Sequence, residues 1–399
     1  MWSRSADQVE AAEGGVLPLL GYEWTAYQPL RADGRGKGSH RTVLFNQPTR
    51  CEAVRIPGRP LPDEGFGRDR GESVYLPDAS REIVTEPAAL WRALDAGIAA
   101  CDEAGLRWIS FAHHPAYTTP QQNDWRMSEN APLREQLVEI YSEHGSSECA
   151  DTSASGCDFA LNLDNGHYPD GAVQTALQLG FRLGFVAGTD GHDARPGSLE
   201  DGPSAVAHWE DTDEDGVVDS PMVQFAAGGL TGVGIPRGQA LSEDALFDGL
   251  EARRTVATTG PRPNFQVYAR GADGVLRPPG ALLPAEALPA ELFLEIEGSD
   301  SRLAAVELVD ASGEVLVAKG DRIFRHRWAP KTAAAAYLRL RYSGPDAAED
   351  RVWFSPWFTD GPAEARCGCA GLPSTSILLL PSVFLALIAR RRRGSAGPP

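Results

Sequence analysis

The stretch Trp108-Ile109-Ser110-Phe111-Ala112-His113-His114 decides the predicted fold. It is a short apolar run that ends in two imidazole side chains. Before it, apolar residues at positions 90, 94, 98 and 101 recur at helical spacing, and residues 85–87 have the composition of a helix N-terminus. The segment therefore predicts a helix followed by a buried strand that delivers His113 and His114 at its carboxyl end.

The same order recurs between residues 16 and 192. Apolar runs at residues 16–20, 138–141 and 183–187 are followed by Glu23, by His144, and by the pair Asp190 and His192. Short helices are predicted at residues 132–137 and 172–179. Helices that alternate with buried strands indicate an α/β fold with a parallel sheet or a β/α barrel, in which ligands bind at the carboxyl ends of the strands.

The period of the pattern changes after Pro261 and Pro263. A last helix is predicted at residues 242–254, and beyond it short runs rich in β-branched and aromatic residues are separated by turn residues. These runs lie at residues 265–268, 292–296, 305–308, 315–317, 337–342 and 352–354. We predict an α/β domain over residues 1–263, a small β-sandwich over residues 264–361 and a tail over residues 362–399.

The predicted tail contains an apolar run. Residues 371–389 carry no charge, and Arg390 to Arg393 follow directly. A run of this length can cross the roughly 30 Å hydrocarbon core of a bilayer. The arginines would then lie on the cytoplasmic side and the bulk of the chain outside the cytoplasm. We predict a C-terminal transmembrane segment, and a buried core helix is the alternative.

The charge of the chain favours some partners over others. Its 399 residues carry a formal net charge of -18. Nucleic-acid-binding proteins present clustered Lys and Arg to phosphates, so we expect no nucleic-acid partner. An acidic chain suits divalent cations and small substrates. The sequence has no G-x-S-x-G elbow, P-loop or G-x-G-x-x-G after a strand, so it gives no support to the chemistries of those motifs.

The residues at the predicted strand ends form a candidate metal site. They are oxygen and imidazole ligands without thiolate: Glu23, His113, His114, His144, Asp190 and His192. A single His near a strand end is more often structural, but here consecutive strand ends all carry such residues. The set suits two or three divalent ions of Zn, Mn or Fe. Glu23, Asp190 and His192 are the predicted catalytic residues, because a carboxylate that bridges two ions lowers the pKa of a shared water, which can then attack phosphorus.

Other polar residues are candidates for binding. His40, Arg41 and Arg195 are predicted to hold a substrate anion, with a surface role as the alternative. Asp211, Asp213, Asp215 and Asp219 match the first nine positions of a calcium loop, although the twelfth position is Met222. A solvated acidic loop is the alternative to a Ca site.

The cysteines outside the tail form an even set: Cys51, Cys101, Cys149 and Cys157. Such a set permits disulfides in an exported chain, and Cys149 with Cys157 is the preferred pair because the two residues enclose a short polar loop. Zinc binding is the alternative, although no C-x-x-C spacing supports it.

Several motifs in order resemble one bacterial family. They are Gly21-Tyr22-Glu23-Trp24-Thr25, Ser39-His40-Arg41, His113-His114-Pro115, the run at residues 139–148, Gly188-Thr189-Asp190-Gly191-His192 and Ala257-Thr258-Thr259-Gly260. From about residue 2 to 360 the chain resembles domain of unknown function 3604, a family that looks like a branch of the PHP (polymerase and histidinol phosphatase) metallohydrolases. The resemblance implies a distorted seven-stranded β/α barrel with up to three metals. Glu23 would be a bridging ligand, and His144, Asp190, His192 and one of His113 and His114 would be further ligands.

The likeness to PHP enzymes has one departure. Those enzymes begin with a strand that ends in H-x-H, whereas the first histidine here is His40. The resemblance therefore implies a barrel that lacks its first strand, through a start codon placed too late or through decay of the gene. We predict that the DNA upstream of Met1 encodes, in frame, a signal peptide and a strand ending in H-x-H. The chain made alone is then expected to be poorly soluble and metal-poor.

The tail resembles the MYXO-CTERM sorting signal of myxobacteria and their relatives. The likeness rests on Cys367-Gly368-Cys369, the apolar run and the arginine cluster. It implies a protein that is exported and processed near the cysteines by a sorting machinery. Such a protein is held in the membrane, at the outer surface or periplasmic side of a Gram-negative bacterium.

Together these patterns predict a surface-anchored, metal-dependent hydrolase of the PHP type that acts on a phosphoester, or a related ester, of a small molecule. The alternative is a non-catalytic surface protein in which the incomplete barrel and the β-sandwich bind a ligand or a polysaccharide. Metal content separates the two hypotheses, because a hydrolase should copurify with transition-metal ions and a binding module need not.

Overall fold

The computed structural model describes residues 17–25, 40–56, 86–117, 123–125, 135–142, 144–153, 157, 167–190, 228–297, 302–330, 332, 334–343 and 349–360. The predicted site residues His192 and Arg195, the four aspartates of the predicted calcium loop and the predicted tail lie outside these ranges. Within them, no helix is both long enough and apolar enough to cross a membrane.

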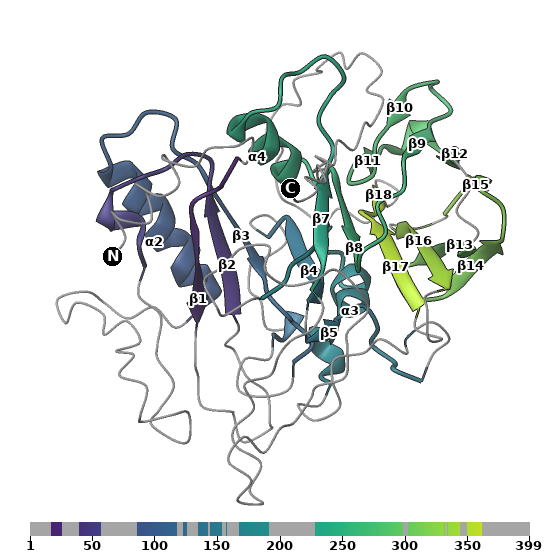
Figure 1. The fold of residues 1–399 in the computed structure, drawn as a ribbon, viewed down its shortest axis with the longest axis horizontal. Coiled ribbons are helices and arrows are strands. Elements are labelled where there is room, and N and C mark those ends of the chain that lie inside the picture. Colours follow the sequence, from purple (N-terminus) through teal and green to yellow (C-terminus); the bar gives the residue numbers. More distant parts are fainter. Residues whose placement is uncertain are drawn as a thin grey trace, which may run out of the picture.

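The first sheet holds the strands on which the candidate site is built (Figure 1). Its order is β1 (Gly21–Thr25), β2 (His40–Phe45), β3 (Trp108–Ala112), β4 (Leu137–Ser142) and β5 (Gly145–Ser146), and β6 (Gly184–Ala187) also pairs with β4. β3 and β6 run parallel to β4, whereas β2 runs antiparallel to β1 and β3, and β5 antiparallel to β4. The sheet is therefore mixed.

Two further sheets make up most of the remaining described chain. One has the order β11 (Leu282–Leu283), β18 (Trp357–Thr359), β16 (Ala335–Ser343), β17 (Glu349–Phe354), β8 (Thr255–Thr258) and β7 (Leu230–Val233), with β13 (Leu303–Asp310) on β16 and β14 (Val315–Lys319) on β13. The other is β10 (Leu276–Arg277), β9 (Phe265–Arg270), β12 (Ala290–Ile296) and β15 (Ile323–Trp328). β8 pairs with β17, so one sheet runs across the predicted boundary between residues 263 and 264.

The helices of the described chain are few and short. They are α2 (Pro87–Ala100), α3 (Val173–Gln178) and α4 (Glu243–Glu251), with 3-10 turns η1 (Glu52–Val54), η5 (Pro169–Gly171) and η6 (Ala285–Ala287). α4 begins where its sequence predicts, because the Ser242 hydroxyl accepts a hydrogen bond from the Ala245 backbone N–H at 3.1 Å. α2 begins with Pro87 at its first position, where the missing N–H costs nothing.

The prediction of a β/α barrel is wrong. The described chain is mostly β-structure with few helices, and its sheets stay open rather than closing into a barrel. The barrel prediction required a helix between successive parallel strands. Instead β2, which the sequence pattern did not reveal, runs antiparallel between β1 and β3. The predicted helix at residues 132–137 also fails within the described chain, since residues 135 and 136 are not helical and Leu137 begins β4.

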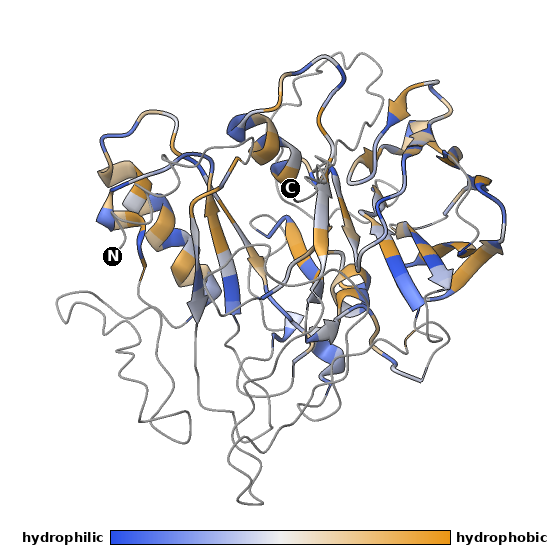
Figure 2. Cartoon of the chain, viewed as in Figure 1, coloured by the Kyte–Doolittle hydropathy of each residue, from blue (hydrophilic) through white to orange (hydrophobic). Residues whose placement is uncertain are grey.

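The two faces of the first sheet are covered by different helices. Val43 and Val138 on one face belong to the same buried cluster as Leu90 and Leu94 of α2. Successive side chains of a strand point to opposite faces. Leu137 therefore lies on the other face, where Phe111, Leu137 and Val186 cluster with Phe247 and Leu250 of α4. Figure 2 shows apolar and polar residues together on α2 and α4, as expected for helices that cover a sheet on one side.

Disulfides tie two loops to the first sheet region. Cys149 is joined to Cys157, the pair that the sequence favoured, and Cys51 before η1 is joined to Cys101 at the end of α2. The second bridge closes a loop with a sequence separation of 50 residues. In the chain-entropy view, closing a loop of that size restricts the unfolded chain and stabilises the fold by up to about 4 kcal/mol.

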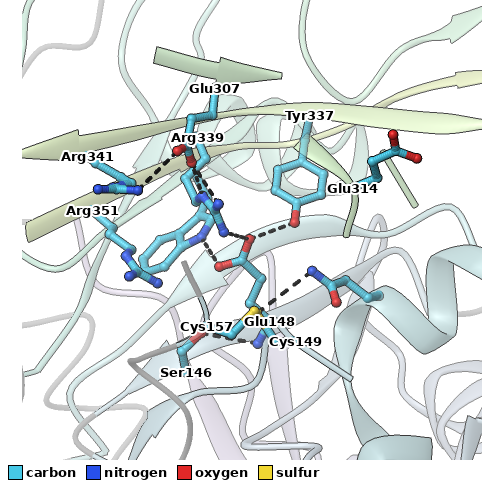
Figure 3. A network of polar contacts seen from close by, with 12 residues as sticks. Ser146, Glu148, Cys149, Cys157, Glu307, Glu314, Tyr337, Arg339, Arg341 and Arg351 are labelled. Atoms are coloured by element: carbon cyan, nitrogen blue, oxygen red, sulfur yellow. Dashed lines mark hydrogen bonds and ion pairs between the residues drawn. A yellow bond between two sulfur atoms is a disulfide. The ribbon is translucent and has the colours of Figure 1, made fainter. Parts of the chain in front are cut away.

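A buried polar network ties the segment after β5 to the second sheet (Figure 3). The Glu148 carboxylate accepts hydrogen bonds from the Tyr337 hydroxyl at 2.6 Å, from Arg339 Nη1 at 2.9 Å and from Trp353 Nε1 at 2.8 Å. Arg339 also pairs with Glu307 at 2.7 Å. Burial and the Glu148 charge raise the pKa of Tyr337 well above its ordinary value, so its hydroxyl stays a donor. The network fixes the chain four residues beyond His144.

Candidate functional site

Strand register brings His40, His113 and Glu139 side by side. β2 and β3 pair Arg41 with Ala112, and just beyond this pair the His113 backbone N–H donates to the His40 carbonyl at 3.1 Å. β3 and β4 pair Ala112 with Val138, which makes Glu139 the neighbour of His113. Three strands that are far apart in sequence therefore place ionisable groups in one row across the sheet.

The Glu139 carboxylate fixes the histidine pair that follows β3. Its Oε2 lies 2.8 Å from His113 Nδ1, and its Oε1 accepts the His114 backbone N–H at 3.1 Å. His113, His114 and Glu139 are all buried. A carboxylate that accepts from Nδ1–H leaves Nε2 as the ring atom available for a metal, which is the usual outer-sphere arrangement of metal-binding histidines.

Asp190 stands at the end of β6 and faces two imidazoles. Its Oδ2 lies 3.1 Å from His113 Nε2 and 2.9 Å from His144 Nε2. Asp190 and His114 both have positive φ angles, 53° and 31°. Non-glycine residues rarely adopt this conformation, and such residues concentrate at functional sites.

His114 has a buried nitrogen that lacks a hydrogen-bond partner. Its Nδ1 is shielded from solvent and meets no partner among the described residues. The ring lies against those of His113, Tyr117 and His144, with centroid distances of 4.2, 5.0 and 5.0 Å. Buried polar atoms are almost always satisfied, so an orphan imidazole nitrogen in this setting suits a metal ion.

One ligand atom each from His113, His114 and Asp190 lies within 4.8 Å of the other two. This cluster, which we call the HHD cluster, combines two imidazoles with a carboxylate and contains no thiolate. Such a donor set is typical of Zn, Mn or Fe sites. The described residues therefore fit the predicted transition metal, although two further predicted ligands, Glu23 and His144, flank the HHD cluster rather than join it.

Charges and burial set the protonation of the HHD cluster. Burial alone would lower the pKa of His113, but the carboxylates of Glu139 and Asp190 raise it well above its ordinary value. Burial and the charges of His113, His40 and His144 hold the pKa of His114 well below its ordinary value, so this ring keeps a lone pair at neutral pH. Burial would raise the pKa of Asp190, yet His113 and His144 hold it far below the usual range.

Glu23 and His40 form the neighbouring part of the site. The His40 Nδ1 contacts Glu23 Oε1, and the His40 and His114 rings lie tilted to each other with centroids 5.0 Å apart. Burial would raise the pKa of Glu23, but the hydrogen bond and charge of His40 lower it. His40 therefore orients the Glu23 carboxylate, and its predicted role in holding a substrate anion stays a prediction.

A cavity of about 480 Å³ opens beside these groups. Glu23, Thr42, His113, Glu139 and Asp190 line one part of it. Mostly apolar residues from the segment before β1, the first sheet, β7 and α4 line the rest, together with Thr231. Its volume is typical of small-molecule sites. The structure therefore brings four predicted or newly identified ionisable residues to the wall of one cavity.

Arg41 does not belong to this cavity. Its side chain is fully buried, with Nε 2.7 Å from Glu135 Oε1 and Nη2 3.1 Å from Asn123 Oδ1. The predicted role in holding a substrate anion is therefore replaced by a structural ion pair. His192 and Arg195, two and five positions after Asp190 in sequence, lie beyond the described residues, and their predicted roles stay predictions.

Sequence reasoning missed Glu139 and Tyr117 as site residues. The signal for Glu139 was present, because a carboxylate stands inside the otherwise apolar run Leu137-Val138-Glu139-Ile140-Tyr141. A charged residue in a buried strand is rare unless it is paired. Tyr117 carried no such signal, since only the turn after His114 brings its ring to 5.5 Å from that of His144.

Comparisons with known proteins identify part of this chain. Residues 172–273, which include Asp190, match the sequence profile of a family described as "Protein of unknown function (DUF3604)". An uncharacterized protein of Chlamydia pneumoniae is 32% identical over 148 residues, which are 37% of this chain and 20% of that protein. An uncharacterized protein of Chlamydia trachomatis is 32% identical over 157 residues, 38% of this chain and 21% of that protein. The match thus spans about a fifth of each relative. No solved structure matches the chain.

Proposed function

We propose that this protein is a metal-dependent hydrolase that cleaves a phosphoester, or a related ester, of a small molecule. The observation that carries the proposal is the HHD cluster, in which ligand atoms lie within 4.8 Å of one another and the buried His114 Nδ1 meets no hydrogen-bond partner among the described residues. The ligand set is similar to that of PHP metallohydrolases. Anchoring at the cell surface through residues 362–399 stays a prediction, because those residues lie outside the described ranges.

One ring nitrogen each of His113 and His114 and an Asp190 carboxylate oxygen would hold a divalent ion. Such an ion supplies a low pKa for a bound water and neutralises charge on phosphoryl oxygens. Glu139 orients His113 and the His114 backbone. Glu23, about a third exposed at the cavity wall, is placed to accept a proton, and His40 holds its carboxylate in position.

The net charge of the site explains why a cation must come first. Glu23, Glu139 and Asp190 are three carboxylates on the wall of the same cavity. Without a cation these carboxylates would repel a phosphate ester, whereas one divalent ion offsets most of their negative charge and two ions make the same wall positive. We therefore expect phosphate binding to depend on metal.

The test uses the full-length chain loaded with Mn²⁺ or Zn²⁺. Metal content is measured by elemental analysis, and phosphate release is followed on a panel of phosphomonoesters and phosphodiesters. His114→Ala is expected to lower metal affinity at least tenfold and to abolish release. The matched control is His326→Ala on β15, a partly exposed histidine far from the site in sequence. Release by metal-free protein, or unchanged release by His114→Ala, would contradict the proposal.

A further inference from the structure

The cavity beside the HHD cluster is apolar over most of its wall. Leu19, Leu44, Phe111, Val186, Leu246 and Leu250 line it, together with Leu17 and Val233. Apart from Glu23, His113, Glu139 and Asp190 at the cluster, its lining in the described chain contains no charged side chain or imidazole. The cavity is therefore divided into a charged end and a hydrocarbon end.

Strand geometry explains this division. Residues two apart on a strand share a face. Phe111 and His113 thus lie on one face, as do Leu137 and Glu139, and Leu137 packs with Phe111 and Val186 beneath the cavity. This face of the sheet carries ionisable side chains at the carboxyl ends of β3 and β4. Two residues earlier on each strand, the same face carries apolar side chains. A molecule that reaches from one end to the other passes directly from carboxylates and imidazoles to Leu and Phe side chains.

The wall formed by α4 is held in place from the opposite side. Arg107, just before β3, lies 2.9 Å from Asp248 and 2.7 Å from Glu251 on α4. Leu246 and Leu250 of the same helix face the cavity. These ion pairs join α4 to the residue just before β3, but they are partly exposed and contribute little stability.

We infer that the substrate is an ester whose alcohol carries a hydrocarbon chain, a monoalkyl phosphate in its simplest form. This inference rests on the proposed function and adds the chemical class of the group attached to the ester oxygen. A sugar or nucleoside in the same place would bury hydroxyl groups against Leu and Phe side chains without hydrogen-bond partners, which costs free energy for each group. A hydrocarbon chain gains from the same surface.

Binding of non-hydrolysable analogues tests the inference without requiring turnover. The probes are methylphosphonate, butylphosphonate and hexylphosphonate, titrated by calorimetry into full-length protein loaded with Zn²⁺. Affinity is expected to rise up to about four-fold for each methylene that enters the cavity, and thus up to about 15-fold from butyl to hexyl. Inorganic phosphate should compete with all three probes, and burial of the chain should give a negative heat-capacity change.

A variant in the cavity wall distinguishes binding of the hydrocarbon chain in the cavity from non-specific hydrophobic binding. Leu246→Gln should reduce the gain from butyl to hexyl to less than about threefold, because the amide places a polar group against the chain. Leu241→Gln is the matched control, since Leu241 precedes the same helix, is 59% exposed and does not line the cavity. The ratio of two affinities is compared, so a partly unfolded variant does not imitate the effect.

The outcomes distinguish the two levels of the proposal. Equal affinities for methyl- and hexylphosphonate, no binding of any probe, or an unchanged ratio in Leu246→Gln would overturn the hydrocarbon inference. Phosphate release from butyl phosphate is measured in parallel. Chain-length-dependent binding without any release would overturn the proposed hydrolase activity and would leave the apolar site standing.

Discussion

Glu139 links the two histidines of the HHD cluster through both of its oxygens. Each oxygen accepts one hydrogen bond, from the His113 ring and from the His114 backbone. A glutamine has the same shape but offers one acceptor oxygen and one NH₂ group. One of the two donors would therefore face another donor, and His113 would lose the negative charge that raises its pKa.

We predict that Glu139→Gln lowers metal affinity by about 10- to 100-fold, the usual effect of losing an outer-sphere partner. The fold should survive, because the replacement has the same volume. Zn²⁺ affinity measured by competition with a chromophoric chelator checks the effect, and Glu295→Gln on β12 is the control. Equal Zn²⁺ affinity in both variants would show that Glu139 does not support a metal ligand.

At the scale of single residues, the sequence predicted which ionisable residues belong to the site better than it predicted the contacts that they make. The ionisable residues at strand ends predicted His113, His114 and Asp190, and the structure brings these three together. The same pattern could not separate His40, which contacts Glu23, from Arg41, which is buried on Glu135. Adjacent residues on a strand point to opposite faces, and only the pairing of β2 with β1 and β3 decides which face meets the cavity.

At the scale of elements, single substitutions should lower stability strongly where the segment after β5 contacts strands β16 and β17. Glu148 and Arg339 have side chains that are 1% exposed. Removing one charge of a buried pair leaves the other unpaired at a cost of about 3–5 kcal/mol. Trp353 Nε1 and the Tyr337 hydroxyl would also lose their acceptor if Glu148 were replaced.

We therefore predict that Glu148→Ala and Arg339→Ala each lower the free energy of unfolding by about 3–5 kcal/mol. The double variant should lose clearly less than the sum, because neither charge is then left alone. Urea unfolding followed by tryptophan fluorescence measures all three. Strict additivity of the two single losses would contradict a direct coupling between the residues.

Elements with a strong local signal were predicted well, and elements that depend on partners were not. The predicted strand at residues 108–112 coincides with β3, and the predicted helix start at Ser242 holds for α4. β15 was missed because Arg325, His326 and Arg327 make Ile323–Trp328 look like a loop. Only its pairing with β12 reveals that Phe324 and Trp328 face the core.

At the scale of the whole molecule, the HHD cluster joins the ends of β3 and β6. These ends are far apart in sequence, so the cluster exists only in the folded chain. A metal that binds only the native arrangement stabilises the fold by mass action, by about 2.7 kcal/mol at a free concentration one hundred times the Kd. The midpoint temperature of thermal unfolding of the full chain should therefore rise by several degrees with Zn²⁺ or Mn²⁺. A chelator should return it to its value without metal. Asp190→Asn should remove most of that shift, and Asp170→Asn in η5 should retain it.

The pairing of β8 with β17 limits how this chain can change over generations. Val256, Ala257 and Thr258 hydrogen-bond within the sheet to partners about a hundred positions later, Phe354, Trp353 and Val352. A recombination that exchanged everything after Pro263 would strip β8 of that neighbour and expose a bare strand edge, which invites association with other chains. The segment after Pro263 is thus not a module that can be exchanged among unrelated proteins. We therefore expect it to be inherited together with the strands that carry the site and to vary mainly by insertions in loops away from the β8–β17 pairing.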